Sequence, residues 1–380
     1  MTRSDADRPR ALSSDLVETS LSVIRAGQAP SGALTAGPTF SQYGFSWIRD
    51  GSFIDEALSM AGEIESADRF HRWVARIVLA SVQGIERARA AGRAGRVPDE
   101  ADYLHCRYSA DGEPSRDDGW FSFQLDGPGI WLWSLTRHLL YGGRLDDELH
   151  AAVGPTARYL ADLWQLPCAD AWEEHGDKVH TSTLAAIRAG LDAAVSLEPG
   201  LADEPAVADA RTGLEAWMSA DEGAYTKWAG SDEVDASVLW MAAPYETVLP
   251  TEARFAATLE RIEREIVDAD GAVHRFISDT FYGGGAWPVL TSAYGRVLLR
   301  RGEPVDLERA LAALRWIEAQ ADAHGHLPEQ VPDHALAPER IDEWREQWGE
   351  SARPLLWSHA TYLALRTELA ERIDLDQPDA

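Results

Sequence analysis

The chain has little of what marks secreted, membrane-bound or metal-binding proteins. It holds two cysteines, Cys106 and Cys168, whose spacing fits no metal motif and supports no disulfide framework. No apolar stretch is long enough to span a membrane, and no apolar run follows the charged N-terminus MTRSDADRPR. We therefore expect a cytoplasmic protein with neither a signal peptide nor a membrane contact.

Positive charge is also scarce. The only lysines are Lys178 and Lys227, and the 35 basic residues face 63 acidic ones, which gives a formal net charge of −28. Binding to a phosphate backbone requires a basic surface, so we expect no nucleic-acid partner. Strand-like alternation of apolar and polar residues is rare as well, which argues against a β-rich fold.

Helical periodicity, in contrast, extends along most of the 380 residues. Six helical segments follow short motifs rich in Trp, Gly or acidic residues and begin near positions 49, 128, 180, 234, 286 and 354. Six segments without such motifs alternate with them and begin near positions 11, 66, 145, 201, 251 and 304. The alternation predicts an all-α protein, an (α/α)6 barrel of six inner and six outer helices. Parallel inner helices would present their N-termini, and the motifs before them, at one mouth.

Several details of this barrel can be checked individually. We expect one domain over residues 1–380 with a flexible tail at 1–10, and a single long helix over 66–93. An inner helix is expected over 234–242, and Pro155 is expected to break the helix over 145–165. The mouth should carry long loops and minor β-hairpins, the hairpins within 98–123 and 267–284.

Tryptophan is unusually frequent, with 15 in the chain. Its ring offers a flat apolar face and one N–H donor, which suits both a core and the face of a sugar. Five lie inside helical periodicity and are expected in the core: Trp73, Trp131, Trp133, Trp164 and Trp316. Five lie in the motifs and are expected to line a pocket: Trp47, Trp120, Trp172, Trp287 and Trp357.

Three glutamates in or near the motifs are candidates for glycoside chemistry. Hydrolysis of a glycoside needs an acid that protonates the leaving oxygen, and a carboxylate that acts as a base toward water or as a nucleophile. Glu173 and Glu174 follow Trp172 in AWEEHG, and Glu329 lies far along the chain in HLPEQ. Each alone resembles a solvated surface acid. Their apolar neighbours favour a catalytic role, because such surroundings raise the pKa of a carboxyl group.

Two arginine–aspartate pairs also lie in the motifs. Arg49 and Asp50 follow Trp47, and Arg275 precedes Asp279 by four residues just ahead of YGGGAWP. Such a pair either holds sugar hydroxyls by charge-assisted hydrogen bonds or forms a simple salt bridge. The glycines after Asp279 exclude a helix there and permit close approach of a ligand.

The ordered motifs WIRD, QLDGP, WEE, DAS, R-x-x-x-D before GGGAWP, LPEQ and WSHA resemble those of glycoside hydrolase family 15, the glucoamylase-like enzymes, over residues 43–362. The resemblance implies an inverting α-glucosidase in which Glu173 is the general acid and Glu329 the general base. It also implies that Arg49, Asp50 and Arg275 grip the glucose at subsite −1. The other implied substrate contacts are Trp47, Trp120, Asp126, Trp172, Glu174 (at subsite +1), Asp279, Trp287 and Trp357.

The sequence is most similar in layout to compact actinobacterial members of the family that hydrolyse isomaltose. It shows neither the β-sandwich nor the starch-binding domain of other members, which favours short oligosaccharides over granular starch. We therefore expect release of β-glucose from the non-reducing end of short α-gluco-oligosaccharides, with α-1,6-linked isomaltose preferred.

Other functions stay open on the residues alone. The alternatives within the enzyme class are an α-1,4-glucosidase of the glucoamylase type, a trehalase and a phosphorylase, although a carboxylate at Glu329 would repel phosphate. A non-catalytic sugar-binding protein would rely on the aromatic residues and would not need both acids. We expect no cofactor and no metal, because the histidines form no convincing ligand set: His175, His180, His324, His326 and His359.

Overall fold

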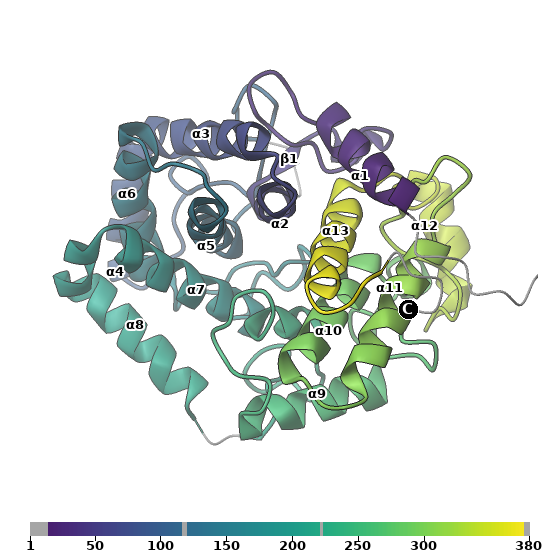
Figure 1. Ribbon diagram of the computed structural model, residues 1–380. Coiled ribbons are helices and arrows are strands. Elements are labelled where there is room, and N and C mark those ends of the chain that lie inside the picture. The colour runs from purple at the N-terminus through teal and green to yellow at the C-terminus, as the bar shows by residue number, and fades with distance from the viewer. Residues whose placement is uncertain (1–13, 116–119, 221–222, 376–380) are drawn as a thin grey trace, which may run out of the picture.

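The computed structural model describes residues 14–115, 120–220 and 223–375, and these are mostly helical (Figure 1). Five α-helices and one short 3-10 helix form an inner ring: α2 Ile48–Met60, α5 Asp126–Leu140, α7 Thr181–Leu197, η4 Ala236–Met241, α10 Pro288–Arg301 and α13 Leu356–Ala370. Each contacts the next, and α13 contacts α2, so the ring is closed.

A second layer of helices surrounds this ring, as Figure 1 shows. It consists of α1 Ser14–Ala26, α3 Ile64–Ala80, α6 Asp147–Leu163, α8 Pro205–Met218, α9 Ala253–Glu265 and α11 Asp306–Ala319. Inner and outer members alternate along the chain, which confirms the predicted (α/α)6 barrel. None of the helices in the described ranges combines the length and apolar character needed to cross a membrane. The tail expected at 1–10 lies outside the described residues, and the single-domain organisation stays a prediction.

Three helices differ from the sequence-based expectation. The long helix expected over 66–93 is two, α3 and α4 Val82–Arg93, because Ser81 between them has φ −94° and ψ 3°. Pro155 lies inside α6 without breaking it. The carbonyl of Ala151, which loses its usual N–H partner there, is on an exposed residue and can bond to water.

The inner helix expected over 234–242 is only the 3-10 helix η4. The carboxylate of Asp235 accepts the backbone N–H of Ser237 and caps its start. Pro244, three residues after Met241, has no N–H and disfavours helical geometry in the residue before it, so the segment cannot continue as an α-helix.

Short β-pairings lie at the mouth. Strand β1 Ser46–Trp47 leads directly into α2 and pairs antiparallel with β2 Arg107–Tyr108. The hairpins expected within 98–123 and 267–284 are single bridges, including His105 with Phe123 and Val267 with Val273. The motif before α2 is thereby tied to the long loop that follows α4.

Inner helices α5 and α7 make an especially close contact through two glycines. A Cβ added to Gly190 would lie 2.6 Å from both the Cα and the carbonyl oxygen of Gly129. Both are backbone atoms, which cannot move aside as the end of a flexible side chain can. We therefore predict that Gly190→Ala lowers the free energy of unfolding by about 1–3 kcal/mol, the usual cost of overpacking.

Chemical denaturation followed by circular dichroism would measure this loss. The matched control is Gly200→Ala, whose added Cβ would meet nothing within 4 Å. Equal stability of the two variants would contradict the close contact between α5 and α7.

Candidate active site

The loops and turns before the inner helices enclose one cavity of about 330 Å³. This volume lies near the lower end of the range for small-molecule sites, about 300–1,000 Å³. Eleven of the thirteen residues predicted for the site line it: Trp47, Arg49, Asp50, Trp120, Trp172, Glu173, Glu174, Arg275, Trp287, Glu329 and Trp357.

The two remaining residues lie behind the arginines. Asp126 Oδ2 is 3.6 Å from Arg49 Nη1, and Asp279 accepts hydrogen bonds from Arg275 Nε at 2.7 Å and Nη2 at 2.5 Å. Both aspartates are almost completely buried and are absent from the cavity lining. Their position suits them to hold the arginines in place, which differs from the direct sugar contact expected from the sequence.

Glu173 lies on a tight turn between α6 and α7. Its φ is 67°, in the left-handed region that L-residues rarely adopt. Asp170 stabilises the turn, since its carboxylate accepts the N–H groups of Trp172 at 3.0 Å and Glu174 at 2.9 Å. Trp47 Nε1 donates to Glu173 Oε1, and Arg49 Nη2 lies 3.6 Å from the same oxygen.

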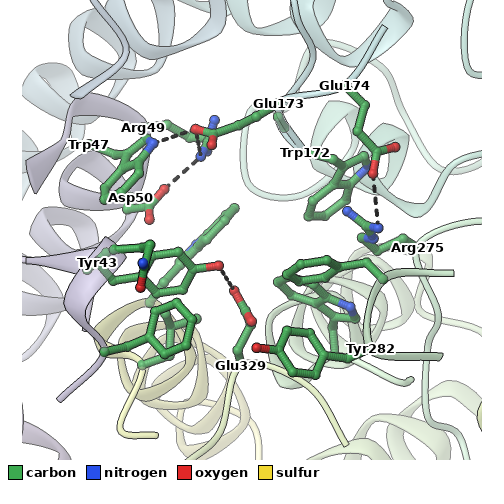
Figure 2. Close-up of a pocket in the computed structure, with 18 of the residues that line it drawn as sticks. Tyr43, Trp47, Arg49, Asp50, Trp172, Glu173, Glu174, Arg275, Tyr282 and Glu329 are labelled. Carbon is green, nitrogen blue, oxygen red and sulfur yellow. Dashed lines mark hydrogen bonds and ion pairs between the residues drawn. The ribbon is translucent and has the colours of Figure 1, made fainter. Parts of the chain in front are cut away.

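Glu329 lies on the other side of the open space in Figure 2, facing Tyr43. The Tyr43 hydroxyl donates to Oε1 at 2.7 Å, and Ser351 Oγ donates to Oε2 at 3.3 Å. Burial raises the pKa of Glu329 to about 7, although these two hydrogen bonds and the positive charge of Arg275 each lower it. The group therefore changes protonation near neutral pH.

The start of α2 places one cation and one carboxyl group at the cavity wall. Arg49 donates to Asp50 Oδ1 at 3.1 Å and to Gln124 Oε1 at 2.9 Å, so its guanidinium is held on two sides. Burial raises the pKa of Asp50 to about 6, and the adjacent Arg49 lowers it. A carboxyl and a guanidinium held this way present both acceptors and donors to a polyhydroxylated ligand.

A second cation lies on the Glu174 side of the cavity. Arg275 Nη2 donates to Glu174 Oε1 at 3.3 Å (Figure 2). The guanidinium carbon lies 5.3 Å from the ring centroid of Trp172 and 5.5 Å from that of Trp287. Aromatic rings and charged groups therefore share this wall, which offers a sugar both apolar faces and hydrogen-bond partners.

The structure adds cavity residues that the sequence-based prediction did not include. Tyr43 lies three residues before the SWIRDG motif, and Tyr282 lies in YGGGAWP with a φ of 49°. Helix α12 Ile341–Trp348 contributes Trp344 and Trp348, and Trp344 stacks on Tyr282 with centroids 5.9 Å apart. Two tryptophans four residues apart on an otherwise polar segment were a signal in the sequence, since they share one face of a helix.

One group among the described residues brings three potential metal-ligand atoms within 4.8 Å of one another: Asp55, His71 and His138. It is buried among α2, α3 and α5, and none of its members lines the cavity. His71 Nε2 lies 2.7 Å from Asp55 Oδ2, and His138 Nδ1 lies 2.9 Å from Ser59 Oγ. We interpret it as a polar cluster of the core and assign it no chemistry.

Comparisons with known proteins agree with this geometry. Residues 15–366 match the family described as glycosyl hydrolases family 15. The chain is 40% identical to an isomaltose glucohydrolase of Kribbella flavida over 362 residues, which cover 93% of this chain and 92% of that protein.

Two solved structures extend the comparison. A glycosidase variant solved in complex with glucose shares 39% identity and a TM-score of 0.86, over 94% of this chain and 96% of that one. A bacterial glucoamylase complexed with acarbose shares 21% identity and a TM-score of 0.70, over 96% of this chain and 56% of that one, and supports the fold alone.

Proposed function

The chain belongs to glycosyl hydrolases family 15 and is therefore a glycoside hydrolase, and on this premise we propose that it is an inverting, exo-acting α-glucosidase that prefers isomaltose. The observation that carries the proposal is the placement of Glu173 and Glu329. They come from segments more than 150 positions apart in the chain, yet they line one cavity and approach its open space from different sides (Figure 2).

In the proposed reaction, Glu173 donates its proton to the glycosidic oxygen while the bond from that oxygen to C1 breaks. Glu329 takes a proton from a water molecule whose oxygen forms the new bond to C1 from the opposite face. The products are β-glucose and the shortened sugar. Inverting enzymes hold the two carboxyl groups about 6.5–9.5 Å apart to leave room for this water.

The remaining cavity residues would hold the sugar on either side of the scissile bond. We assign Arg49, Asp50 and Trp357 to the glucose at −1, where a fixed cation and carboxyl group can bind adjacent hydroxyls. We place Arg275, which the sequence-based prediction put at −1, on the leaving-group side with Glu174 and Trp172. Its guanidinium donates to Glu174 and lies 5.3 Å from the ring centroid of Trp172. The relative that is 40% identical is an isomaltose glucohydrolase, and this supports an α-1,6-linked disaccharide as substrate.

Substrate and stereochemistry can be tested together. We predict that kcat/KM is highest for isomaltose when isomaltose, maltose, panose, trehalose and soluble starch are compared, with no dependence on added phosphate. Proton NMR of the first product should show β-glucose, because water attacks opposite the leaving group. Initial α-glucose would disprove inversion, and a higher kcat/KM for trehalose or maltose would replace the proposed substrate.

The roles of Glu173 and Glu329 can be distinguished by comparing the activity of their variants on substrates with different leaving groups. We predict that Glu173→Gln and Glu329→Gln each lower kcat on isomaltose by about 10²–10⁴-fold, the usual contribution of general acid–base catalysis. α-Glucosyl fluoride needs little protonation to release fluoride, so Glu173→Gln should retain most of its activity on it and Glu329→Gln should not.

Glu371→Gln, at an exposed position, is the control and should behave as the wild type. The assignment of acid and base would be reversed if Glu329→Gln, rather than Glu173→Gln, kept its activity on the fluoride.

Tyr43 should set the acid limb of the pH profile. The base acts when deprotonated, so kcat/KM should fall as the pH drops through the pKa of Glu329, about 7 in the free enzyme. The Tyr43 hydrogen bond lowers this pKa, so Tyr43→Phe should move the acid limb to higher pH and lower the plateau. A limb that stays in place, or moves to lower pH, would show that Tyr43 does not act on Glu329.

A further inference from the structure

Lys227, one of the two lysines in the chain, is buried behind the leaving-group wall with only 2% of its surface exposed. Its backbone is fixed on both sides, since its carbonyl accepts the N–H of Thr181 at the start of α7 and its N–H donates to the carbonyl of Glu233. The side chain therefore starts from a rigid point and extends into the wall.

Three carboxylates surround its ammonium group. Nζ lies 3.6 Å from Asp235 Oδ2, 3.7 Å from Glu174 Oε2 and 3.8 Å from Asp170 Oδ2, and 3.2 Å from the ring centroid of Phe276. These are ion-pair distances rather than hydrogen bonds, so Lys227 acts on the three carboxylates through its charge. Without this cation the three acids would repel one another in a poorly solvated site.

Each of the three carboxylates fixes a part of the site. Asp170 accepts the backbone N–H groups that shape the turn around Glu173. Asp235 accepts the indole N–H of Trp172 at 3.0 and 3.1 Å. Glu174 lines the cavity itself, and its other oxygen accepts from Arg275. The charge of Lys227 is thus shared by the turn, the aromatic wall and the acid at the leaving-group side.

We propose that Lys227 is a positioning residue for the leaving group, which acts through Glu174, Asp170 and Asp235 without touching the sugar. It fixes the direction of Glu174 and the turn that carries Glu173, and so determines how efficiently a sugar leaving group is bound and protonated. This inference rests on the proposed hydrolysis of α-glucosides.

The test compares two substrates that share the −1 glucose and differ in the leaving group. Isomaltose places a glucose at +1 and requires its protonation, whereas α-glucosyl fluoride places no sugar there. We expect Lys227→Met to lower kcat/KM for isomaltose about 10- to 100-fold, since a misplacement of about 1 Å costs up to about 100-fold. The value for α-glucosyl fluoride should stay nearly unchanged.

Lys178→Met is the matched control, because Lys178 is the other lysine and is partly exposed beside Asp177. It should hydrolyse both substrates as the wild type does. A parallel loss on both substrates in Lys227→Met would indicate general structural damage and overturn the proposal, as would no loss on either. Absence of isomaltose hydrolysis by the wild type would instead refute the proposed function, so the two failures are distinguishable.

A double-mutant cycle with Glu174→Gln tests the route of the effect. If Lys227 acts through Glu174, Lys227→Met should cost much less on isomaltose in the Glu174→Gln background than in the wild type. Losses that simply multiply would overturn that route.

If Lys227→Met does not fold, Lys227→Arg replaces it. Arginine keeps the charge, but its planar fork cannot replace a point charge among three carboxylates, so the ratio of isomaltose to fluoride activity should fall. An unchanged ratio in a folded Lys227→Arg would also overturn the proposal.

Discussion

The cavity depends on three buried cations that compensate an excess of carboxyl groups. Four carboxyl groups line it: those of Asp50, Glu173, Glu174 and Glu329. Arg49 lies beside the carboxyl groups of Asp50 and Glu173. Arg275 and Lys227 lie beside the carboxyl group of Glu174. Removing a cation from beside a buried carboxylate would leave an uncompensated buried charge, which costs several kcal/mol. The three cations therefore allow several carboxyl groups to lie close together around the cavity, in a protein whose net charge is already −28.

The same compensation gives the two proposed catalytic acids different surroundings. Glu173 contacts an indole N–H and lies beside Arg49, whereas Glu329 is held by the hydroxyls of Tyr43 and Ser351. The raised pKa lies on Glu329, the proposed base, so the assignment of acid and base rests on the motifs shared with the family and not on these surroundings. The backbone contributes as well, since the left-handed conformation at Glu173 is maintained by hydrogen bonds to Asp170.

The sequence allowed the ring of helices and most of the cavity lining to be predicted, because both follow from local patterns. Helical periodicity located the inner and outer helices, and the motifs at the inner-helix starts located residues such as Arg49 and Glu173. Tyr43 and Ser351 could not be identified in this way, because their importance comes from a contact with Glu329 that only the folded chain creates. The motifs also placed Asp126 and Asp279 near the site. Only the folded chain shows that they contact Arg49 and Arg275 from behind and do not line the cavity.

One part of the cavity wall is held less firmly by the barrel than the residues assigned to −1. The residues assigned to −1 are fixed by the starts of α2 and α13, two neighbours in the closed ring. Trp344 and Trp348 belong to α12, a helix with no buried residues that contacts the barrel through η5 Phe281–Gly283 and a hydrogen bond from Trp344 Nε1 to the carbonyl of Thr280. A substitution in such a peripheral segment can reshape the pocket without moving an inner helix. We therefore expect changes in α12 to alter the choice of linkage while Glu173, Glu329 and the inner helices remain in place.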